Sequence, residues 1–250
     1  MSDDWILVTE QLTKEFRGFV AVAGVDLKVR RGTIHALIGP NGAGKTTVFN
    51  LLTRFLPATR GKILYNGQEI TALRPAEIAR RGVVRSFQVS AVFPKMTVLE
   101  NVRVALQRKL GTSFHFWKRE STLRPLEARA RELLAEVDLE SFAATLAVEL
   151  PYGRKRSLEL ATTLALEPEL LLLDEPTQGM GHEDVGRVTA LIEKVAKQRT
   201  VLMVEHNLSV VAELSDTITV LARGSVLAEG TYEEVSKNPA VLEAYIGVAE

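Results

Sequence analysis

The sequence predicts an α/β fold with a mostly parallel sheet, an N-terminal antiparallel β subdomain and an inserted α-helical subdomain. Apolar runs at 170–173, 200–204 and 218–221 alternate with helical patterns, as in parallel sheets covered by helices. The first residues, to about position 40, instead alternate apolar and polar side chains with a period of two, which is typical of half-buried antiparallel strands. From about Ser90 to Glu167 the pattern is helical and highly charged, and we assign this stretch to the insert.

The elements before the insert follow from local patterns. A nearly continuous apolar run at 33–38 predicts a buried strand that stops at a glycine-rich turn. Residues 46–56 carry apolar side chains on one helical face, and the helix is expected to end before Pro57. A strand and turn at 61–67, a short helix at 75–81 and a strand at 83–87 complete this part.

The remaining elements belong to the insert and to the second half of the sheet. Helices are predicted in the insert at 97–109, 123–137 and 153–167, around a polar, aromatic-bearing loop at 111–122. Between the later strands we expect helices near 183–198 and 208–214. The tail at 231–246 predicts two short helices, which begin at Thr231 and at Asn238-Pro239.

Length and composition restrict the class of protein. A chain of 250 residues with 46% hydrophobic residues is expected to form one domain, or one domain with an inserted subdomain. The absence of cysteine excludes disulfide scaffolds, Cys-ligated metal sites and cysteine nucleophiles, and fits a reducing compartment. The acidic N-terminus predicts no secretory signal, and no run approaches the ~18 apolar residues of a membrane span. Any membrane role is therefore expected to be peripheral, through a partner.

The net charge of zero argues against a general nucleic-acid binder, which usually carries a basic excess. The sum hides an asymmetry. Eight basic residues against two glutamates between 103 and 131 give a local charge of +6, and five glutamates against one lysine after Ser225 give −4.

A glycine-rich loop between the strand 33–38 and the following helix predicts a phosphate-binding loop and a P-loop NTPase core. It satisfies the pattern G-x-x-x-x-G-K-[ST], in which backbone N–H groups and the helix N-terminus surround phosphate oxygens. The lysine would lie near the β- and γ-phosphates and the first threonine would bind Mg²⁺; the alternative is a glycine turn with an incidental lysine. The loop consists of Gly39, Pro40, Asn41, Gly42, Ala43, Gly44, Lys45, Thr46 and Thr47.

Two acidic residues follow the apolar strand at 170–173. Strand ends of this kind emerge where α/β folds bind their ligands. Asp174 is placed to hold Mg²⁺ and Glu175 to orient and deprotonate an attacking water. The alternative is an acidic strand end beside a helix N-cap.

With these motifs in order, the chain resembles the nucleotide-binding subunit of an ABC transporter over nearly its whole length. The resemblance implies that Phe16 stacks on adenine, that Gln88 is the Q-loop glutamine touching Mg²⁺, and that His206 is the switch histidine. The resemblance also makes Glu175 the catalytic base. The alternatives are that Phe16 is an ordinary core residue, that Gln88 is a solvated polar residue and that His206 is a structural histidine. The tail and the form of the signature resemble the branch that imports branched-chain amino acids, urea and short-chain amides.

The resemblance also implies a division of the chain and a signature motif. A RecA-like core with its antiparallel β subdomain would span 1–88 and 168–250, and the α-helical subdomain 89–167 would carry the signature. Proline replaces the usual serine there, tyrosine the first glycine and arginine the glutamine, while Gly181 stands at the usual acid or amide of the D-loop. The signature that would meet a partner's ATP is Leu150, Pro151, Tyr152, Gly153 and Arg154.

The function implied is an ATP-hydrolysing subunit that uses ATP and Mg²⁺ to drive uptake of a small polar solute, branched-chain amino acids first. It would dimerise head to tail with a second ABC ATPase subunit, as a heterodimer given the signature departures. Its other partners would be transmembrane permease subunits and, indirectly, an extracytoplasmic solute-binding protein, with no nucleic acid, at the cytoplasmic face of the membrane. The basic, aromatic-bearing segment 114–119 would lie near permease loops or lipid headgroups; the alternative is a solvated surface loop.

Three alternatives remain open from the sequence, and a fourth is disfavoured. The same ATPase could serve a urea or amide importer, or an exporter, because the solute is selected by other chains. A soluble ABC protein of translation or DNA repair would use the same engine without a membrane. A P-loop kinase or GTPase would have no reason to carry the signature, Gln88 and His206.

Overall fold

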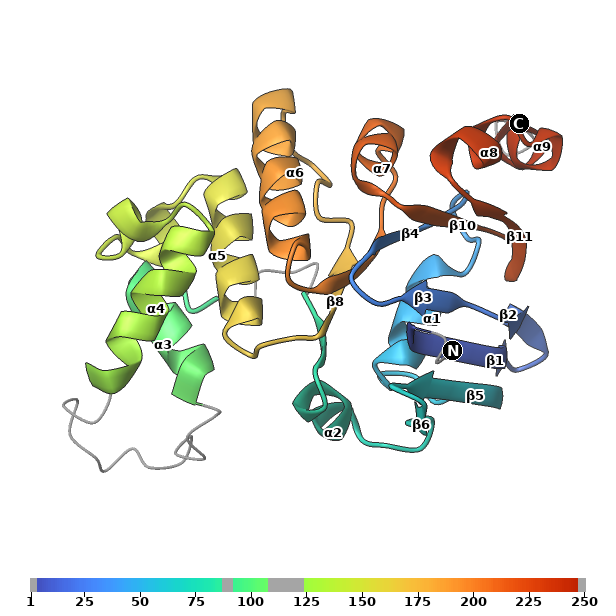
Figure 1. Ribbon diagram of the computed structural model, residues 1–250, viewed down its shortest axis with the longest axis horizontal. Coiled ribbons are helices and arrows are strands. Elements are labelled where there is room, and N and C mark those ends of the chain that lie inside the picture. The colour runs from blue at the N-terminus through green and yellow to red at the C-terminus, as the bar shows by residue number, and fades with distance from the viewer. Residues whose placement is uncertain (1–3, 87–91, 108–123, 247–250) are drawn as a thin grey trace. The chain divides into compact units, whose positions relative to one another are not determined.

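The computed structural model describes residues 4–86, 92–107 and 124–246 (Figure 1). The chain divides into two compact units. The first comprises Met1–Arg85, Glu169–Gln178 and Ala196–Glu250, and the second comprises Ser86–Pro168 and Gly179–Val195. Residues 179–195 thus group with the helical unit, whereas the sequence analysis placed them with the core. The described part has the α/β fold that the sequence predicts, with one antiparallel and one mostly parallel sheet.

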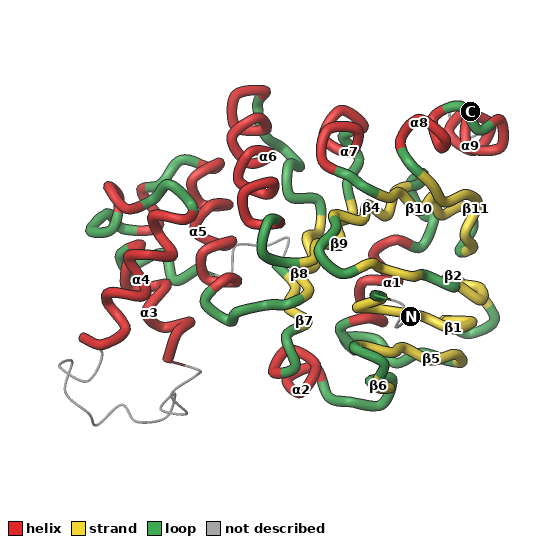
Figure 2. Tube along the Cα trace, in the orientation of Figure 1, coloured by secondary structure: helices red, strands yellow, loops and turns green. Residues whose placement is uncertain are grey.

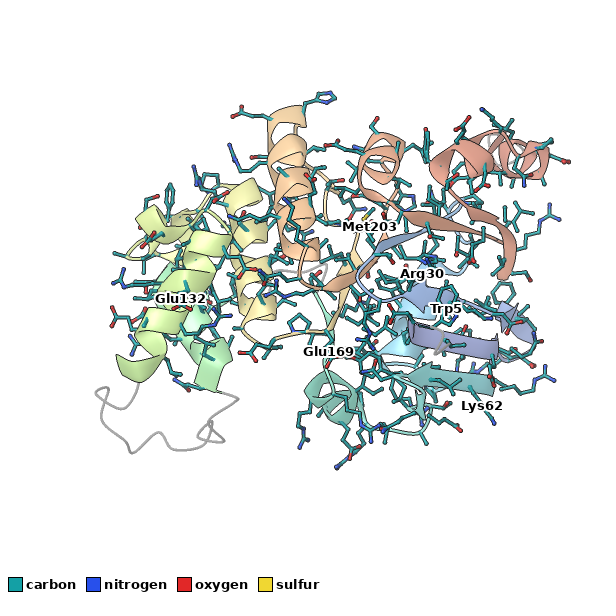
Figure 3. All side chains as sticks on the ribbon, viewed as in Figure 1. Trp5, Arg30, Lys62, Glu132, Glu169 and Met203 are labelled. Atoms are coloured by element: carbon teal, nitrogen blue, oxygen red, sulfur yellow. The ribbon has the colours of Figure 1, made fainter. Side chains whose placement is uncertain are left out.

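The antiparallel sheet of the first unit is built around one long strand, β1 (Trp5–Phe16). This strand pairs with β2 (Phe19–Val25), β3 (Lys28–Arg30) and β5 (Arg60–Tyr65), and β5 pairs with β6 (Gln68–Glu69). Its inward side chains are completely buried, including Ile6, Leu7 and Leu12. On an outer position, the Trp5 ring lies beside the cations of Lys28 and Arg30, 5.9 and 5.5 Å from the ring centroid (Figure 3).

The second sheet of the first unit has the strand order β11-β10-β4-β9-β8-β7 (Figure 2). Four neighbouring pairs of strands are parallel, and β11 pairs antiparallel with β10 at the edge. The central strands are buried along their whole length, which explains their continuous apolar sequences. The strands are β4 (Ile34–Ile38), β7 (Val83–Arg85), β8 (Leu170–Asp174), β9 (Thr200–Val204), β10 (Thr217–Ala222) and β11 (Ser225–Gly230).

The helices of the first unit pack against these sheets. The helix α1 (Lys45–Leu52) buries Val48, Phe49, Leu51 and Leu52, all without solvent exposure. The other helices are α2 (Pro75–Arg80), α7 (Leu208–Leu214), α8 (Tyr232–Ser236) and α9 (Pro239–Ile246). The two tail helices begin where predicted, since Thr231 caps α8 in a capping box with Glu234. Both contact β11, a strand that the sequence analysis missed (Figure 1).

The second unit is helical. Its helices α3 (Val98–Gln107), α4 (Arg124–Glu136) and α5 (Tyr152–Leu164) contact one another pairwise. Short 3-10 turns at Glu140–Phe142 and Ala147–Glu149 connect α4 to α5, and α6 (His182–Ala196) follows β8 in the chain. The helices α4, α5 and α6 end one to three residues earlier than predicted, because pattern alone locates helix ends poorly. The predicted loop at 111–122 lies outside the described residues.

One histidine of the sheet is buried and linked to two neighbouring strands. His35 in β4 is 1% exposed, and its Nε2 lies 2.7 Å from the Thr219 hydroxyl of β10. That hydroxyl donates to the carboxylate of Glu229 in β11 at 2.6 Å, so the imidazole Nε2–H donates to Thr219. Burial lowers the pKa of His35 to about 4. The histidine is therefore neutral and structural.

This burial makes folding stability depend on pH. Between its unfolded pKa of 6.5 and its folded pKa of about 4, only the unfolded chain protonates His35, so the free energy of unfolding falls as the pH falls. The full loss is on the order of 3 kcal/mol. His35→Gln should flatten this part of the profile in urea denaturation between pH 7 and pH 4. His182→Gln, at an exposed position, serves as the control, and profiles of wild type and His35→Gln that stay parallel would contradict the prediction.

Candidate functional site

The candidate site lies at one edge of the mostly parallel sheet. The strands β4, β9, β8 and β7 are consecutive neighbours and run in the same direction. Their carboxyl ends therefore meet at one edge, the usual ligand-binding edge of α/β folds. The phosphate loop follows β4, His206 follows β9, and Asp174 ends β8 with Glu175 directly after it. The topology thus brings together three motifs that are far apart in the sequence.

The phosphate loop has a backbone that only glycine fits at two positions. Gly39 and Gly44 have φ values of 148° and 102°, in the region that favours glycine. A Cβ at Gly39 would lie 2.1 Å from the carbonyl oxygen of Leu221, and one at Gly44 would lie 2.7 Å from that of Ala21. The loop is therefore held tightly against β10 and β2, and it leads directly into the N-terminus of α1.

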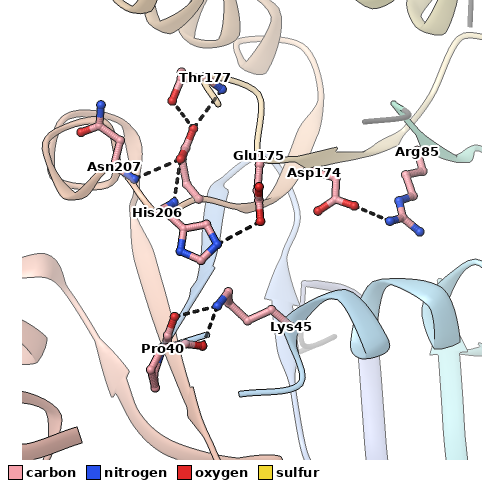
Figure 4. Close-up of polar contacts among 10 residues, drawn as sticks. Pro40, Lys45, Arg85, Asp174, Glu175, Thr177, His206 and Asn207 are labelled. Atoms are coloured by element: carbon pink, nitrogen blue, oxygen red, sulfur yellow. Dashed lines mark hydrogen bonds and ion pairs between the residues drawn. The ribbon is translucent and has the colours of Figure 1, made fainter. Parts of the chain in front are cut away.

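Lys45 is a buried cation within this loop. Its ammonium group donates to the carbonyl oxygens of Gly39 at 2.6 Å and Pro40 at 2.9 Å (Figure 4). Burial lowers the pKa of Lys45, and the negative charge of Glu175 opposes that shift. A phosphate group at the loop would supply the anionic partner that such a desolvated cation favours. The residues present thus fit a nucleotide phosphate.

Asp174 forms a buried ion pair with Arg85 at the end of β7. The Arg85 guanidinium contacts the Asp174 carboxylate (Figure 4). It also donates to the Asn50 side chain of α1 at 2.7 Å. Both side chains are at least nine-tenths buried. The sequence analysis missed Arg85, and the available signal was a cation within the predicted strand 83–87, whose partner depends on strand pairing.

Glu175 and His206 follow the paired strands β8 and β9, and their side chains contact each other beyond the ends of these strands. The His206 Nε2 lies 2.9 Å from Glu175 Oε1, and Figure 4 shows the ring pointing at this carboxylate. The Glu175 side chain is 10% exposed and that of His206 is 41% exposed. The sequence-predicted base and switch histidine are thus brought together, with one of them open to solvent.

Glu205 is a second carboxylate at this edge, and the sequence analysis did not single it out. It is 3% exposed and accepts hydrogen bonds from the loop after β8 and from the loop after β9. An acid placed directly after a buried apolar strand, next to a predicted site residue, was the available signal.

Phe16 lies at the tip of the β1–β2 hairpin, where it pairs with Phe19. Its ring is 41% exposed, so it is not the core phenylalanine that the alternative required. The Lys14 ammonium lies 4.9 Å from the ring centroid. The hairpin reaches the loop through Ala21, whose carbonyl oxygen abuts Gly44. An exposed aromatic face is therefore available near the loop.

The tail also reaches the phosphate loop. Burial raises the pKa of the Tyr245 hydroxyl in α9, and a hydrogen bond with the backbone of Gly39 opposes that rise. The last helix thus contacts the first residue of the loop.

The signature residues lie in the second unit, at the start of α5. Pro151 is the N-cap residue, and no side chain caps this end. Leu150 is buried, while Tyr152 is 48% exposed. The Arg154 guanidinium lies 4.1 Å from the Phe142 ring centroid, a cation–π contact. Gly153 is buried beside Asp184, since a Cβ there would lie 2.4 Å from the Asp184 carboxylate and that side chain would have to shift.

Other predicted positions add little geometry. Gln88 lies outside the described residues. Thr46 is exposed at the start of α1 and Thr47 is half-buried. A Cβ at Gly181 would meet nothing within 4 Å, so space alone does not exclude an acid there. In the described ranges, none of the helices is long and apolar enough to cross a membrane.

Comparison with known proteins adds a family to this geometry. The ABC transporter profile matches residues 22–178, and a profile for branched-chain amino acid ATP-binding cassette transporters matches 225–250. The high-affinity branched-chain amino acid transport ATP-binding protein BraF of Pseudomonas aeruginosa is 43% identical, over 98% of each chain.

Solved structures agree with this match. The ADP conformation of an ATP-binding cassette of an ABC transporter superposes with a TM-score of 0.86 at 32% identity, covering 97% of this chain and 99% of that one. A dimeric bacterial ABC transporter cassette, 24% identical, shares the fold with a TM-score of 0.74, covering 90% and 98%. The profile match and the full-length relative establish that the chain belongs to the ABC transporter family, as an ATP-binding cassette that hydrolyses ATP.

Proposed function

We propose that the chain is the ATPase subunit of an importer of branched-chain amino acids. The observation that carries the hydrolytic part is the meeting of Lys45, Glu175 and His206 at one sheet edge. The solute is supported by the tail, because a branched-chain amino acid transporter profile matches 225–250. A relative with this solute in its name is similar over the full length.

In the proposed reaction, Glu175 accepts a proton from the water that attacks the γ-phosphate. Its carboxylate is nearly buried and lies against the His206 imidazole, which orients it. Lys45 supplies a fixed positive charge to the phosphoryl group in transfer, and His206 donates to it from the other side. Phe16 offers its exposed ring to the adenine, a contact worth roughly 1–3 kcal/mol per base.

Mg²⁺ would be held by Thr46 and Asp174, with Gln88 as a further predicted ligand. Magnesium in nucleotide sites usually takes one or two protein oxygen ligands besides the phosphates and water, and a hydroxyl and a carboxylate are oxygen donors of that kind. The ion supplies charge neutralisation of the phosphates when bound. Asp174 would have to share its charge between this ion and Arg85.

The proposed assembly is a head-to-tail heterodimer with a second ABC ATPase, bound to transmembrane permease subunits at the cytoplasmic face of the membrane. A related cassette of the same fold is dimeric. The partner's ATP would meet the N-terminus of α5, where Pro151 offers neither a hydroxyl nor an N–H. Unequal sites support a heterodimer, and an extracytoplasmic solute-binding protein would deliver the solute.

The transport proposal is tested by reconstitution. The chain is co-purified with its permease subunits and placed in proteoliposomes with the candidate binding protein. ATP hydrolysis should rise with leucine, isoleucine or valine, and not with urea or short-chain amides. Stimulation by urea or an amide alone would move the chain to that branch. Purification without any transmembrane subunit would favour the soluble ABC ATPase.

Glu175→Gln should bind ATP, trap a closed dimer and lower turnover by roughly 10²- to 10⁴-fold, because the amide cannot accept the proton. Turnover is measured as phosphate release, and the dimer by size-exclusion chromatography with ATP. Glu213→Gln, an exposed change on α7, is the control and should behave as wild type. Full activity of Glu175→Gln would remove Glu175 from the base role.

Arg85→Gln should destabilise the nucleotide-free chain by about 3–5 kcal/mol, because it leaves the buried Asp174 carboxylate without its cation. Mg²⁺ with ATP should then raise the melting temperature of the variant more than that of wild type. Arg31→Gln, which breaks an exposed ion pair with Glu169, is the control. An equal rise in Arg85→Gln and wild type would contradict a shared Asp174 charge.

Arg154→Ala should lower turnover of the assembled complex while ATP binding to the isolated chain stays unchanged, because Arg154 would serve the partner's nucleotide. Phe142→Leu removes the ring beneath the guanidinium and should cause a smaller loss of the same kind. Unchanged hydrolysis by the Arg154→Ala complex would count against a phosphate contact.

A further inference from the structure

We propose that Glu205 is a positioning residue for hydrolysis: its buried carboxylate ties the loop that carries Glu175 to the loop that carries His206. The inference rests on the proposed roles of these two residues. In the described contacts, the Glu205 carboxylate touches neither the phosphate loop nor the residues proposed to hold Mg²⁺. The inference follows from the four hydrogen bonds of Glu205 and from the strained backbone of Glu175.

The Glu205 carboxylate joins two loops through four donors. On one side, Oε1 accepts from the Thr177 backbone N–H at 3.0 Å and from the Thr177 hydroxyl. On the other side, Oε2 accepts from the backbone N–H groups of His206 at 2.6 Å and Asn207 at 3.0 Å (Figure 4). A carboxylate has about four lone-pair positions, so these donors satisfy it fully. This explains how an acid with 3% exposure is tolerated at the sheet edge.

These four hydrogen bonds, which we call the Glu205 clamp, matter because Glu175 has a strained backbone. Its φ is +48°, in the left-handed region that a residue with a Cβ seldom adopts. Such a conformation persists only when the surroundings over-determine it, and it is typical of functional sites. Two backbone hydrogen bonds fix the turn, from Glu175 N to Val204 O at 2.9 Å and from Gln178 N to Glu175 O at 3.1 Å. Glu205 fixes Thr177, between the ends of this turn.

The two loops are therefore held together at two points. At the front, His206 Nε2 meets Glu175 Oε1 at 2.9 Å, and behind it Glu205 sets the spacing of the two backbones. Moving either loop would lengthen the front contact. Because a misplacement of about 1 Å can lower turnover a hundredfold, a clamp on the backbone acts on the chemical step.

Glu205→Gln separates this role from simple burial. The glutamine amide keeps one acceptor oxygen, but its other group is an NH₂ donor. That donor faces a backbone N–H, which cannot accept a hydrogen bond. The Thr177 hydroxyl can rotate to accept from the amide, so the oxygen should stay with His206 and Asn207, and the Thr177 N–H should lose its acceptor. Thr177→Val removes the hydroxyl and keeps the N–H, while Thr177→Ser keeps both.

The experiment measures hydrolysis by the full-length chain purified with its permease partners. Glu205→Gln should lower kcat roughly ten- to a hundredfold, with the ATP dissociation constant changed by less than about threefold. Thr177→Val should show a smaller loss and Thr177→Ser near wild-type turnover. Thr219→Val, which removes a buried hydroxyl of β10 away from the two loops, is the matched control and should lower thermal stability without changing kcat.

A mutant cycle with His206→Ala tests positioning directly. If Glu205 acts by holding Glu175 against His206, Glu205→Gln should cost less than about twofold in the His206→Ala background, because the contact that it maintains is already absent there. The chain has four histidines, so ¹⁵N-histidine labelling gives a resolvable His206 amide signal. Its proton should lie at low field in wild type and move upfield in Glu205→Gln.

The outcomes separate this inference from the proposed function. Wild-type kcat in Glu205→Gln, while Glu175→Gln and His206→Ala are slow, would overturn the role of Glu205 alone. Losses that multiply fully with His206→Ala would also overturn it. Full turnover in both Glu175→Gln and His206→Ala would contradict the proposed function itself, and the positioning role with it.

Discussion

The hydrogen-bonded ladder of β4, β9 and β8 is the constraint on which the candidate site depends. Because these strands are parallel and adjacent, residues that follow each of them must meet at one edge. The ladder extends to Asp174, which is in register with Val204, and the next residue bonds back to that strand. A register shift would separate Glu175 from His206, so the apolar core beneath the edge also sets the geometry of the polar groups above it.

The edge carries several buried charges, and each is compensated by a different partner. Arg85 neutralises Asp174, backbone carbonyls and Glu175 surround Lys45, and four neutral donors satisfy Glu205. Of these three charged groups, Lys45 is the cation whose hydrogen bonds go to neutral backbone carbonyl oxygens. An incoming phosphate therefore finds its strongest electrostatic attraction at that lysine, while the ion pair and the Glu205 clamp keep the walls of the edge in place.

Sequence patterns located the strands and the motifs well, because continuous apolar runs and glycine-rich turns are local signals. The α/β fold, the two tail helices capped at Thr231 and before Pro239, and the strand positions of Asp174 and His206 are as predicted. The edge strand β11 escaped because its alternating, half-exposed residues resemble a polar tail. Arg85 and Glu205 escaped for another reason: their partners are set by the pairing of strands far apart in sequence.

The helical unit places its own constraints on what the chain offers a neighbour. Gly153 at the start of α5 is buried beside Asp184, whose carboxylate would have to shift to admit a side chain there. Pro151 contributes no donor, and the Arg154 charge is seated on Phe142. The proposed hydrolytic edge thus brings Glu175, His206 and Lys45 together, whereas the proposed signature has no donor at Pro151. In the proposed head-to-tail dimer, that difference would fall on the partner's nucleotide and make the two sites unequal.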